Sequence, residues 1–353
     1  MNIIDKFLLN YNSKSTISSY RTHLNNYFKA IKAKPDETYF NKSRDYLQDI
    51  KKFWQTQVNR PPLTRHASLS CVKIFFLENN IEMPSRFWTQ LKNRVKGSKA
   101  ITKSKIPELH ELKRILQYAD LKSKTLFLVV FSSGMRIRET LQLHESDINM
   151  ESNPVQINIR SKTTKTGNSR ITFISNEAKE SLKEWLRIKK EYIENSSKKC
   201  FKACYILDIK NDPRIFPYHY NTAKYMWDNL VRKAGFLERD EETNRRRLHI
   251  HCLRKAFRVY LSPKATADVA EVLMGHSDAL NNVYRQYTEK QLKNFYLKAM
   301  SDISVFETSS DERLNEFHEE LAQKDKEIQN LKSQMDKMNQ TMLMLLAKKQ
   351  TEQ

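Results

Sequence analysis

Apolar side chains recur every three to four residues through much of the first hundred positions, which is the period of an amphipathic helix. One such segment, Ser15–Ile31, begins with small hydroxyl residues and places Tyr20, Leu24 and Phe28 on one face. The same period predicts three further helices, at Tyr46–Trp54, Leu63–Glu78 and Ser85–Val95. The pattern therefore predicts an N-terminal domain of four or five helices over residues 1–95.

A short polar and basic segment separates this region from the next. Residues 96–105 contain one Gly and no apolar period, so we expect an interdomain linker there. Val155–Ile159 and Arg170–Ile174 alternate in polarity like strands around a turn rich in Lys, Thr, Gly and Asn, which predicts a β-hairpin. The other elements expected in residues 106–306 are helices at Pro107–Tyr118, Lys122–Ser132, Glu177–Ile193, Tyr220–Ala234, His249–Leu261, Ala265–Met274 and Thr288–Met300, and a short strand at Cys204–Leu207. The predicted fold class is mainly α with a small β-hairpin or sheet, α+β overall.

Residues 307–353 carry a different, seven-residue period. One position of the repeat is apolar five times, at Leu314, Leu321, Ile328, Met335 and Met342. A second position holds Phe317, Leu331, Met338 and Leu345, with Lys324 as the exception. A sustained repeat with charged flanking positions predicts a C-terminal coiled coil. A single amphipathic helix packed on the preceding domain is the alternative, because it would show the same apolar stripe.

The distribution of charge points to a class of partner. The 353 residues carry a net charge of +21, with 18 basic and 7 acidic side chains in residues 1–100, 37 and 24 in residues 101–306, and 7 and 10 in residues 307–353. A positive field of this size over two predicted domains favours a polyanionic partner, most simply nucleic acid. Solubility alone is the alternative explanation of a basic composition.

Composition also argues against several other classes. The longest unbroken apolar runs have six residues, as in Leu126–Phe131, so we expect no membrane-spanning helix and no membrane partner. The N-terminus lacks the apolar core of a signal peptide. The four cysteines are too scattered for a disulfide framework, and Cys200 and Cys204 lack the second Cys/His pair of a zinc site. We therefore expect a reducing, cytoplasmic location and no zinc site at these cysteines.

Two stretches place basic side chains beside glycines. Gly134 is expected to end one helix and Arg136 to begin the next, where an Arg can add a bidentate grip on a phosphate. Lys162 and Lys165 flank the tip of the predicted hairpin, and a lysine there can donate a proton or hold a phosphate. Taken singly, each stretch is more typical of an exposed surface than of a phosphate site.

Two later stretches add possible acid–base and nucleophilic groups. His251 and Arg254 are three residues apart and so share one helical face, where an imidazole beside a guanidinium would make a phosphate site with a base in reach. His276 follows a glycine, and Tyr284 and Tyr287 come within the next dozen residues. A tyrosine there could act as a nucleophile, whereas the ordinary alternatives are buried histidines and core tyrosines.

Taken in order, the Arg stretch, the hairpin lysine, the His-x-x-Arg stretch, the Gly-His pair and the tyrosine resemble the tyrosine recombinase (phage integrase) family. The resemblance extends over about residues 1–300. The Gly-His-to-Tyr stretch, the following Thr288–Leu292 and the predicted coiled coil look most like integrases of archaea and their mobile elements. The resemblance implies that residues 1–95 are a helical DNA-binding (core-binding) domain, that residues 106–306 are the catalytic domain, and that double-stranded DNA is the partner.

The resemblance also implies roles for individual residues. Arg136 and Arg254 would clamp the scissile phosphate and stabilise its transition state. Lys165 would protonate the 5′-oxygen leaving group, and Lys162 is the alternative for this role. His251 would act as general base or hydrogen-bond partner of the phosphate. Glu139 occupies a position where the family often has an acidic residue that orients the site.

His276 would donate one further hydrogen bond, and a tyrosine would attack the phosphate to give a 3′-phosphotyrosyl enzyme. The family commonly places this tyrosine nine residues after the Gly-His histidine, but position 285 of this chain is Arg. We favour Tyr284, because it requires only a one-residue deletion in a turn. Tyr287 is the alternative.

The resemblance therefore implies a site-specific DNA recombinase or integrase that needs no metal and no ATP, because the covalent ester conserves the energy of the phosphodiester bond. It is expected to act as a homo-oligomer, a tetramer on DNA. Two other functions fit the same residues: a type IB topoisomerase-like enzyme that relaxes supercoils as a monomer, and a non-catalytic DNA-binding protein on the same scaffold. The predicted coiled coil argues against the topoisomerase.

Overall fold

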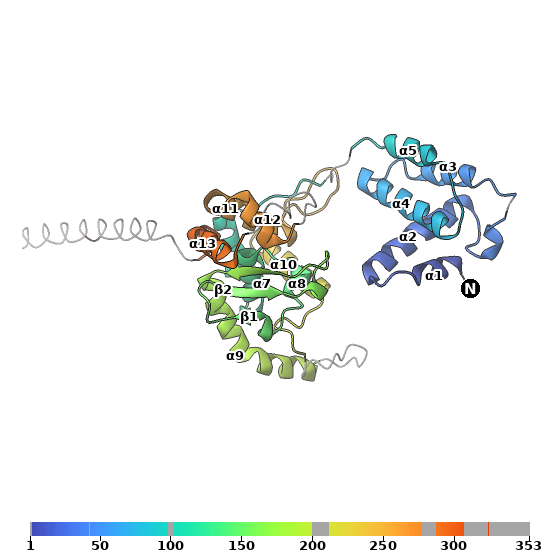
Figure 1. Ribbon diagram of the computed structural model, residues 1–353. Helices are drawn as coiled ribbons and strands as arrows, with labels where there is room; N and C mark the ends of the chain where they lie inside the picture. Colours follow the sequence, from blue (N-terminus) through green and yellow to red (C-terminus); the bar gives the residue numbers. More distant parts are fainter. Residues whose placement is uncertain are drawn as a thin grey trace, which may run out of the picture. The chain divides into compact units, whose positions relative to one another are not determined.

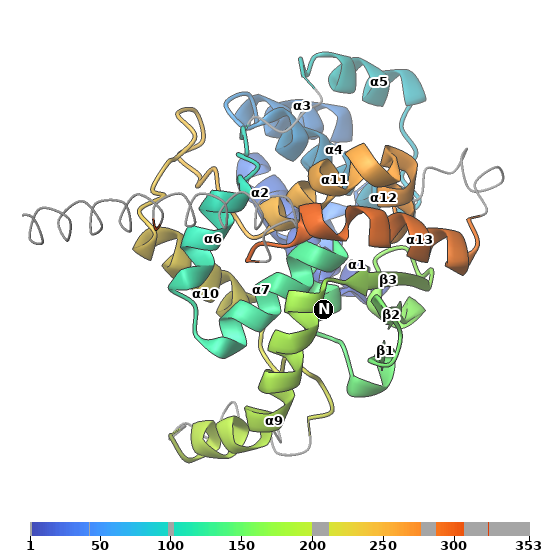
Figure 2. The same cartoon turned by 90° about the vertical axis from the view of Figure 1, so that its left-hand side faces the viewer.

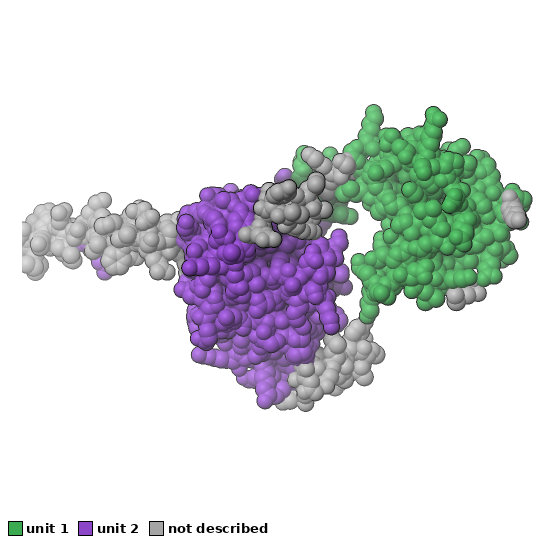
Figure 3. Space-filling model, in the orientation of Figure 1, with its two compact units in different colours: residues 1–103, 240–245 green, residues 104–239, 246–353 purple. Residues whose placement is uncertain are grey.

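The computed structural model (Figure 1) describes residues 2–41, 43–97, 102–199, 212–276 and 287–306, together with Lys324. The chain divides into two compact units (Figure 3): unit 1 comprises residues 1–103 and 240–245, and unit 2 comprises residues 104–239 and 246–353. Three sequence-based expectations lie outside the described residues: the nucleophile candidate Tyr284, the strand Cys204–Leu207, and the coiled coil over 307–353 apart from Lys324.

Unit 1 is built from helices. They are α1 (Ile3–Leu8), α2 (Lys14–Ile31), the short 3-10 turn η1 (Glu37–Tyr39), α3 (Tyr46–Thr56), α4 (Pro62–Glu78) and α5 (Ser85–Asn93). The four helices expected from periodicity are confirmed, whereas α1 is too short to produce a recognisable period. Local capping explains several of the starts: the side chain of Asp45 accepts a hydrogen bond from the Gln48 N–H at 2.9 Å, and Pro62 begins α4.

An aromatic cluster forms the core of unit 1. Tyr27, Phe53, Phe75 and Phe76 have no exposed surface, and their rings meet edge to face. The Tyr27 and Tyr39 hydroxyls share a hydrogen bond of 2.7 Å, so the polar ends of both buried rings are satisfied. The buried aromatic faces of α2, α3 and α4 are therefore the faces that pack together.

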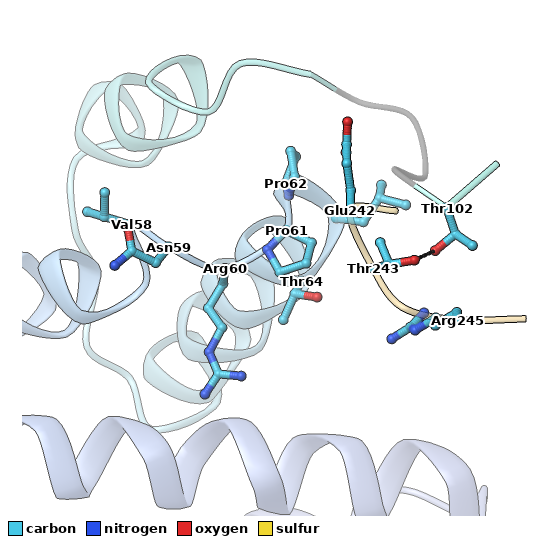
Figure 4. A pocket seen from close by; sticks show the side chains of 11 residues that line it. Val58, Asn59, Arg60, Pro61, Pro62, Thr64, Thr102, Glu242, Thr243 and Arg245 are labelled. Carbon is cyan, nitrogen blue, oxygen red and sulfur yellow. Dashed lines mark hydrogen bonds between the residues drawn. The ribbon is translucent and has the colours of Figure 1, made fainter. Parts of the chain in front are cut away.

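A pocket of about 500 Å³ opens in unit 1 (Figure 4). Its lining comes from the turn between α3 and α4, from the start of α4, and from a second group of residues around Thr102 and Thr243, whose hydroxyls are joined by a hydrogen bond of 3.0 Å. The Lys103 N–H donates to the Asp240 carboxylate at 2.9 Å. In unit 2, the Lys105 N–H donates to the Arg247 carbonyl at 3.0 Å. The described end of the expected linker, residues 102–105, is thus held by specific hydrogen bonds.

Unit 2 combines helices with one small sheet. Its elements are α6 (Leu109–Gln117), α7 (Leu121–Ser133), α8 (Ile137–Thr140), η2 (Glu145–Asp147), β1 (Ile148–Asn149), β2 (Val155–Ile159), η3 (Ser161–Thr163), β3 (Arg170–Ile174), α9 (Asn176–Lys199), α10 (Tyr220–Lys233), α11 (His251–Ala265), α12 (Ala267–Met274), α13 (Glu289–Ala299) and η6 (Met300–Ile303). The predicted mainly helical α+β class is confirmed. Strand β1 was not predicted, because two residues cannot show alternation.

The predicted hairpin is confirmed, with both strands at the expected residues. The sheet has the order β1-β2-β3 with antiparallel neighbours, and Ile159 lies opposite Arg170 at the open end of the β2–β3 loop. Residues facing the core, such as Ile157 and Phe173, are completely buried. The loop that carries Lys162 and Lys165 therefore projects from a rigid base.

Helix α7 is the centre of unit 2. It packs against α9, α11 and β3, and Figure 2 shows it beneath α11 and α13. The six-residue apolar run Leu126–Phe131 lies within it and is at most 1% exposed. An apolar run on all sides of a helix is explained by this burial from several directions. In the described part of the chain, we find no helix with the length and apolarity that a bilayer crossing requires.

The turn after α7 sets the start of α8. Gly134 has φ +63°, a left-handed conformation that costs side-chain-bearing residues free energy but glycine little. A Cβ on Gly134 would lie 2.3 Å from Cδ1 of Phe257 in α11. The turn and α11 can approach this closely only because position 134 is glycine.

Substituting Gly134 by Ala should lower the free energy of unfolding of unit 2 by about 1–3 kcal/mol more than the same change at Gly167, because overpacking a core costs that amount. Gly167 is the matched control: its φ is also positive, at +75°, but a Cβ there meets nothing within 4 Å. Native-state hydrogen exchange of α7 and α11 amides measures unit 2 directly. Equal losses in the two variants would contradict the packing described for Phe257.

Candidate catalytic site

Arg136 stands at the start of α8, as the sequence predicts. Its backbone N–H donates to Oε2 of Glu139 at 3.0 Å, and its Nη1 donates to Oε1 of the same carboxylate at 2.9 Å. The Arg136 side chain is 26% exposed, whereas the Glu139 side chain is 1% exposed. Glu139 therefore binds both the backbone and the guanidinium of Arg136. Part of the guanidinium stays exposed, where a ligand could reach it.

A second arginine, Arg170 at the start of β3, shares this carboxylate. Its Nη2 lies 2.7 Å from Oε2 of Glu139, and its Nε donates to the Leu273 carbonyl at 3.0 Å. Burial opposes ionisation of Glu139, but the hydrogen bonds and charges of Arg170 and Arg136 outweigh it and lower the pKa of the carboxyl. Sequence analysis did not single out Arg170, because an arginine at a strand terminus has no distinctive pattern. The one feature that could have pointed to Arg170 is its place at the start of the second hairpin strand. There it lies opposite Ile159, at the base of the β2–β3 loop that carries Lys162 and Lys165, here called the lysine loop.

Arg254 lies in the first turns of α11 and is only 1% exposed. Its Nη1 donates to the Gly134 carbonyl at 2.5 Å and its Nη2 to the Met274 carbonyl at 2.8 Å. Its Nε is buried and finds no acceptor among the described residues. Burial, together with the positive charges of Arg136 and Arg170, lowers the pKa of Arg254 to about 9. The guanidinium therefore remains charged at pH 7 in surroundings that contain an excess of positive charge.

His251 is the first residue of α11, and the ring of His249 stacks on it at a centroid distance of 6.3 Å. Although part of its surface reaches solvent, desolvation and the neighbouring positive charges of Arg254, His249 and Lys255 lower the pKa of His251 to about 4. The imidazole is therefore neutral at pH 7 and has a lone pair free to accept a proton. Its place three residues before Arg254 on one helix agrees with the sequence expectation.

His276 follows the left-handed turn at Gly275 that ends α12. Its Nδ1 is hydrogen-bonded to the carboxylate of Glu271, which also pairs with Arg258. Burial opposes ionisation of Glu271, but Arg258 and His276 outweigh it and lower the pKa of this carboxyl. The imidazole is 45% exposed, so its outer edge can meet a ligand while Glu271 fixes its orientation.

The remaining candidates are less firmly placed. Lys162 and Lys165 both lie in the β2–β3 loop and are exposed, and their surroundings do not distinguish one from the other. Tyr287 is partly buried against the core of unit 2, with its ring 6.1 Å from that of Phe295 and nearly perpendicular to it. Tyr284 lies outside the described residues.

The structure thus brings Arg136 and Arg254 to one place, since both are linked to the Gly134 turn and Arg170 lies beside both. Three guanidiniums gather there, from Arg136, Arg170 and Arg254, and the carboxylate in direct contact with two of them is Glu139. Such an arrangement suits a bound anion with several oxygens, which guanidinium groups grip with parallel hydrogen bonds. Within the described ranges, no group of His, Cys, Asp and Glu side chains has the arrangement of a metal site.

Comparison with known proteins gives a consistent result. A model of the phage integrase family matches residues 99–293, more than half of the chain. The chain is 27% identical over 186 residues to tyrosine recombinase XerA of Saccharolobus solfataricus, and the aligned region covers 52% of each protein, about half the length of that relative. It is 22% identical over 238 residues to tyrosine recombinase XerD of Haemophilus ducreyi, covering 65% of this chain and 73% of the relative.

Solved structures show the same fold. A lambda integrase dimer bound to a COC' core site matches with a TM-score of 0.56 and 14% identity, over 81% of this chain and 78% of that one. The Tn1549 transposon integrase in complex with transposon right end DNA matches with a TM-score of 0.52 and 15% identity, over 83% of this chain and 96% of that one.

In solution, His251 should titrate near pH 4, well below the ordinary value of 6.5. Between these values the unfolded chain binds a proton that the folded chain does not, so the stability contributed by neutral His251 is lost as the pH falls from about 6.5 to about 4. Replacing Arg136 by Gln should raise the pKa of His251, because it removes one positive charge. NMR titration of the imidazole measures both effects.

The matched control is Arg232→Gln, which removes an exposed arginine of α10 that is not among the charges lowering the pKa of His251. An unchanged His251 pKa in Arg136→Gln would show that the two residues are not coupled through their charges.

Proposed function

The chain belongs to the phage integrase family, and from this we propose that it is a site-specific DNA recombinase that cuts and rejoins DNA strands through a covalent 3′-phosphotyrosyl intermediate. The family match covers the part of the chain that contains every proposed catalytic residue. The proposed substrate is double-stranded DNA, for which the excess of basic side chains in residues 1–306 is suited.

The observation that carries this proposal is the environment of Arg254. Its guanidinium is buried and, within the described residues, forms no ion pair with a carboxylate, and Arg136 and Arg170 lower its pKa further. The carboxylates of Glu139 and Glu271 compensate this buried cation only in part. Such a cation is costly, whereas a cation aimed at a developing negative charge is a strong catalytic device. A phosphodiester between Arg136 and Arg254 would supply the missing charge, and its transition state would supply more of it.

The proposed chemistry uses the residues in distinct roles. The Tyr284 oxygen attacks the phosphorus while its proton passes to His251, the bond to the 5′ oxygen breaks, and Lys165 protonates that oxygen. The products are a 3′-phosphotyrosyl ester and a free 5′-hydroxyl, and attack by a 5′-hydroxyl of another strand reverses the steps. A bound phosphate anion beside His251 would raise the pKa of the imidazole, which makes it a better base once DNA is present. His276 would donate a further hydrogen bond to the phosphate.

Packing supports Tyr284 over Tyr287 as the nucleophile. The Tyr287 ring rests against Phe295 and the core of unit 2, which is a structural use of an aromatic side chain. A nucleophile must instead place its hydroxyl in line with the scissile bond. We therefore assign the covalent step to Tyr284.

The assembly proposed for this reaction is a homotetramer on DNA. Strand exchange joins two duplexes, and each of the four cut strands needs its own nucleophile. Solved structures of the same fold include a lambda integrase tetramer bound to a Holliday junction, with a TM-score of 0.53, and the XerH recombinase bound to its difH substrate, with a TM-score of 0.50. Lambda integrase and XerH are thus the precedents for the proposed DNA partner, and the lambda integrase tetramer is the precedent for the assembly.

Tyr284→Phe should abolish the covalent protein–DNA adduct on a nicked suicide substrate, because it removes the attacking oxygen but keeps the ring. Tyr287→Phe is the matched control and should still form the adduct, since phenylalanine preserves the packing on Phe295. Gel electrophoresis detects the adduct, and mass spectrometry of the DNA–peptide product identifies the residue. An adduct formed by Tyr284→Phe and missing in Tyr287→Phe would reverse the assignment.

Removing residues 307–353 should reduce assembly of the protein on DNA and slow recombination, while leaving the first cleavage step on a single site intact. The reason is that the seven-residue repeat of this segment suits association between chains. Light scattering with and without DNA measures the mass. Leu321→Asp combined with Ile328→Asp tests the same repeat in the full chain. Unchanged assembly and recombination in both variants would exclude an oligomerisation role.

A further inference from the structure

We propose that Arg170 is a positioning residue of the strand-transfer reaction. Its guanidinium fixes the base of the lysine loop to the Arg136–Glu139 pair and to the turn that carries His276. The inference rests on the proposed recombinase function for its kinetic consequences. Its structural part concerns three elements of the chain, β3, α8 and α12, that meet at one side chain.

The hydrogen bonds of Arg170 reach two of these elements at once. Nη2 and Nη1 lie 2.7 and 3.4 Å from the two oxygens of Glu139, and Nε donates to the carbonyl of Leu273, one turn before His276. The Arg170 side chain is 11% exposed, so these bonds are largely shielded from water. Arginine can bridge a carboxylate and a carbonyl in this way because its five donors are held in one rigid plane.

The fit against Gly275 shows how tightly the guanidinium is held. A Cβ on Gly275 would lie 2.7 Å from Cδ and Nε of Arg170 and 2.9 Å from its Cζ. The end of an arginine side chain could usually move away, but here three hydrogen bonds hold it in place. The Gly275 backbone and the Arg170 guanidinium therefore occupy positions that depend on each other.

The charge of Arg170 acts on Arg136 through Glu139. Glu139 is 2% exposed, and a carboxylate so buried stays ionised only when cations compensate it. Arg170 is the strongest of the influences that lower the pKa of Glu139. Only an ionised Glu139 can accept strong hydrogen bonds from both the Arg136 backbone and its guanidinium. Loss of Arg170 therefore weakens the hydrogen bonds between Glu139 and Arg136, although Arg136 itself is unchanged.

The same side chain anchors the hairpin. Arg170 is the first residue of β3 and pairs with Ile159, so the loop with Lys162 and Lys165 begins directly beyond this pair. Two residues further along β3, the Thr172 hydroxyl donates to the Ser133 carbonyl of α7 at 2.7 Å. Strand β3 is thus attached to α7, α8 and α12 at its lysine end, and the lysine loop inherits its position from these attachments.

The test compares Arg170→Ala and Arg170→Lys with the wild-type chain in single-turnover cleavage of a suicide DNA substrate. We expect Arg170→Ala to lower the cleavage rate about 100-fold, as a displacement of catalytic groups by about 1 Å does, with DNA affinity little changed. Arg170→Lys keeps the charge but cannot bridge Glu139 and the Leu273 carbonyl at once. Its cleavage rate should therefore lie between those of the wild-type chain and Arg170→Ala. A substrate with sulfur in place of the 5′-bridging oxygen needs no protonation of its leaving group and should recover part of the lost rate.

Arg214→Ala is the matched control. Arg214 is 16% exposed and pairs with Asp212 at 2.5 Å, so its loss removes a similar ion pair from unit 2 outside the site. It should cost stability but leave the cleavage rate unchanged. Equal loss of rate in Arg214→Ala and Arg170→Ala would reduce Arg170 to a general stabilising residue and overturn the proposal.

A second arm needs no DNA and therefore separates this inference from the proposed function. Hydrogen exchange of the Arg136 guanidinium protons, followed by NMR, should be faster in Arg170→Ala than in the wild-type chain and unchanged in Arg214→Ala. Gly275→Ala should also speed this exchange, but should add little in an Arg170→Ala background, where the obstructing side chain is gone. Faster exchange in a chain that forms no DNA adduct would sustain the positioning role and refute the recombinase function. Unchanged exchange would overturn the positioning role.

Discussion

The site depends on one buried carboxylate. Glu139 is almost completely excluded from water, yet Arg170 and Arg136 keep it ionised, and its two oxygens fix the position of Arg136. Removing one partner of such a buried pair typically costs about 3–5 kcal/mol, because the other charge is left uncompensated. The arginine cluster is therefore a single electrostatic unit whose members cannot be exchanged independently.

The second constraint is steric and lies in two turns. Gly134 admits the Phe257 ring, and its carbonyl accepts a hydrogen bond from Arg254. Gly275 admits the Arg170 guanidinium, and the carbonyl of the preceding Met274 binds the other end of Arg254. In both turns the absence of a side chain thus allows close packing, and a backbone carbonyl accepts a hydrogen bond from Arg254. The packing of the fold and the geometry of the proposed phosphate-binding groups are set by the same few atoms.

The electrostatic environment sets which protonation states the site favours. Burial and neighbouring cations lower the pKa of both His251 and Arg254, so the site lies at high positive potential and favours its neutral imidazole. A phosphodiester would reverse this balance, since its negative charge stabilises both protonated groups. The same charges that strain the unliganded site therefore favour the ligand and its transition state.

The sequence alone predicted most of the local structure and proposed Arg136, His251 and Arg254 as site residues. Helical spacing puts His251 and Arg254 on one face, and alternation locates both strands of the hairpin, because these patterns depend on neighbours a few residues away. Tertiary structure alone decided which charges are buried and which side chains share them. Arg170 and Glu139 are 31 residues apart, and Arg254 and Gly134 are 120 apart. No sequence period connects such positions, since desolvation and shared hydrogen bonds arise only when distant segments pack together.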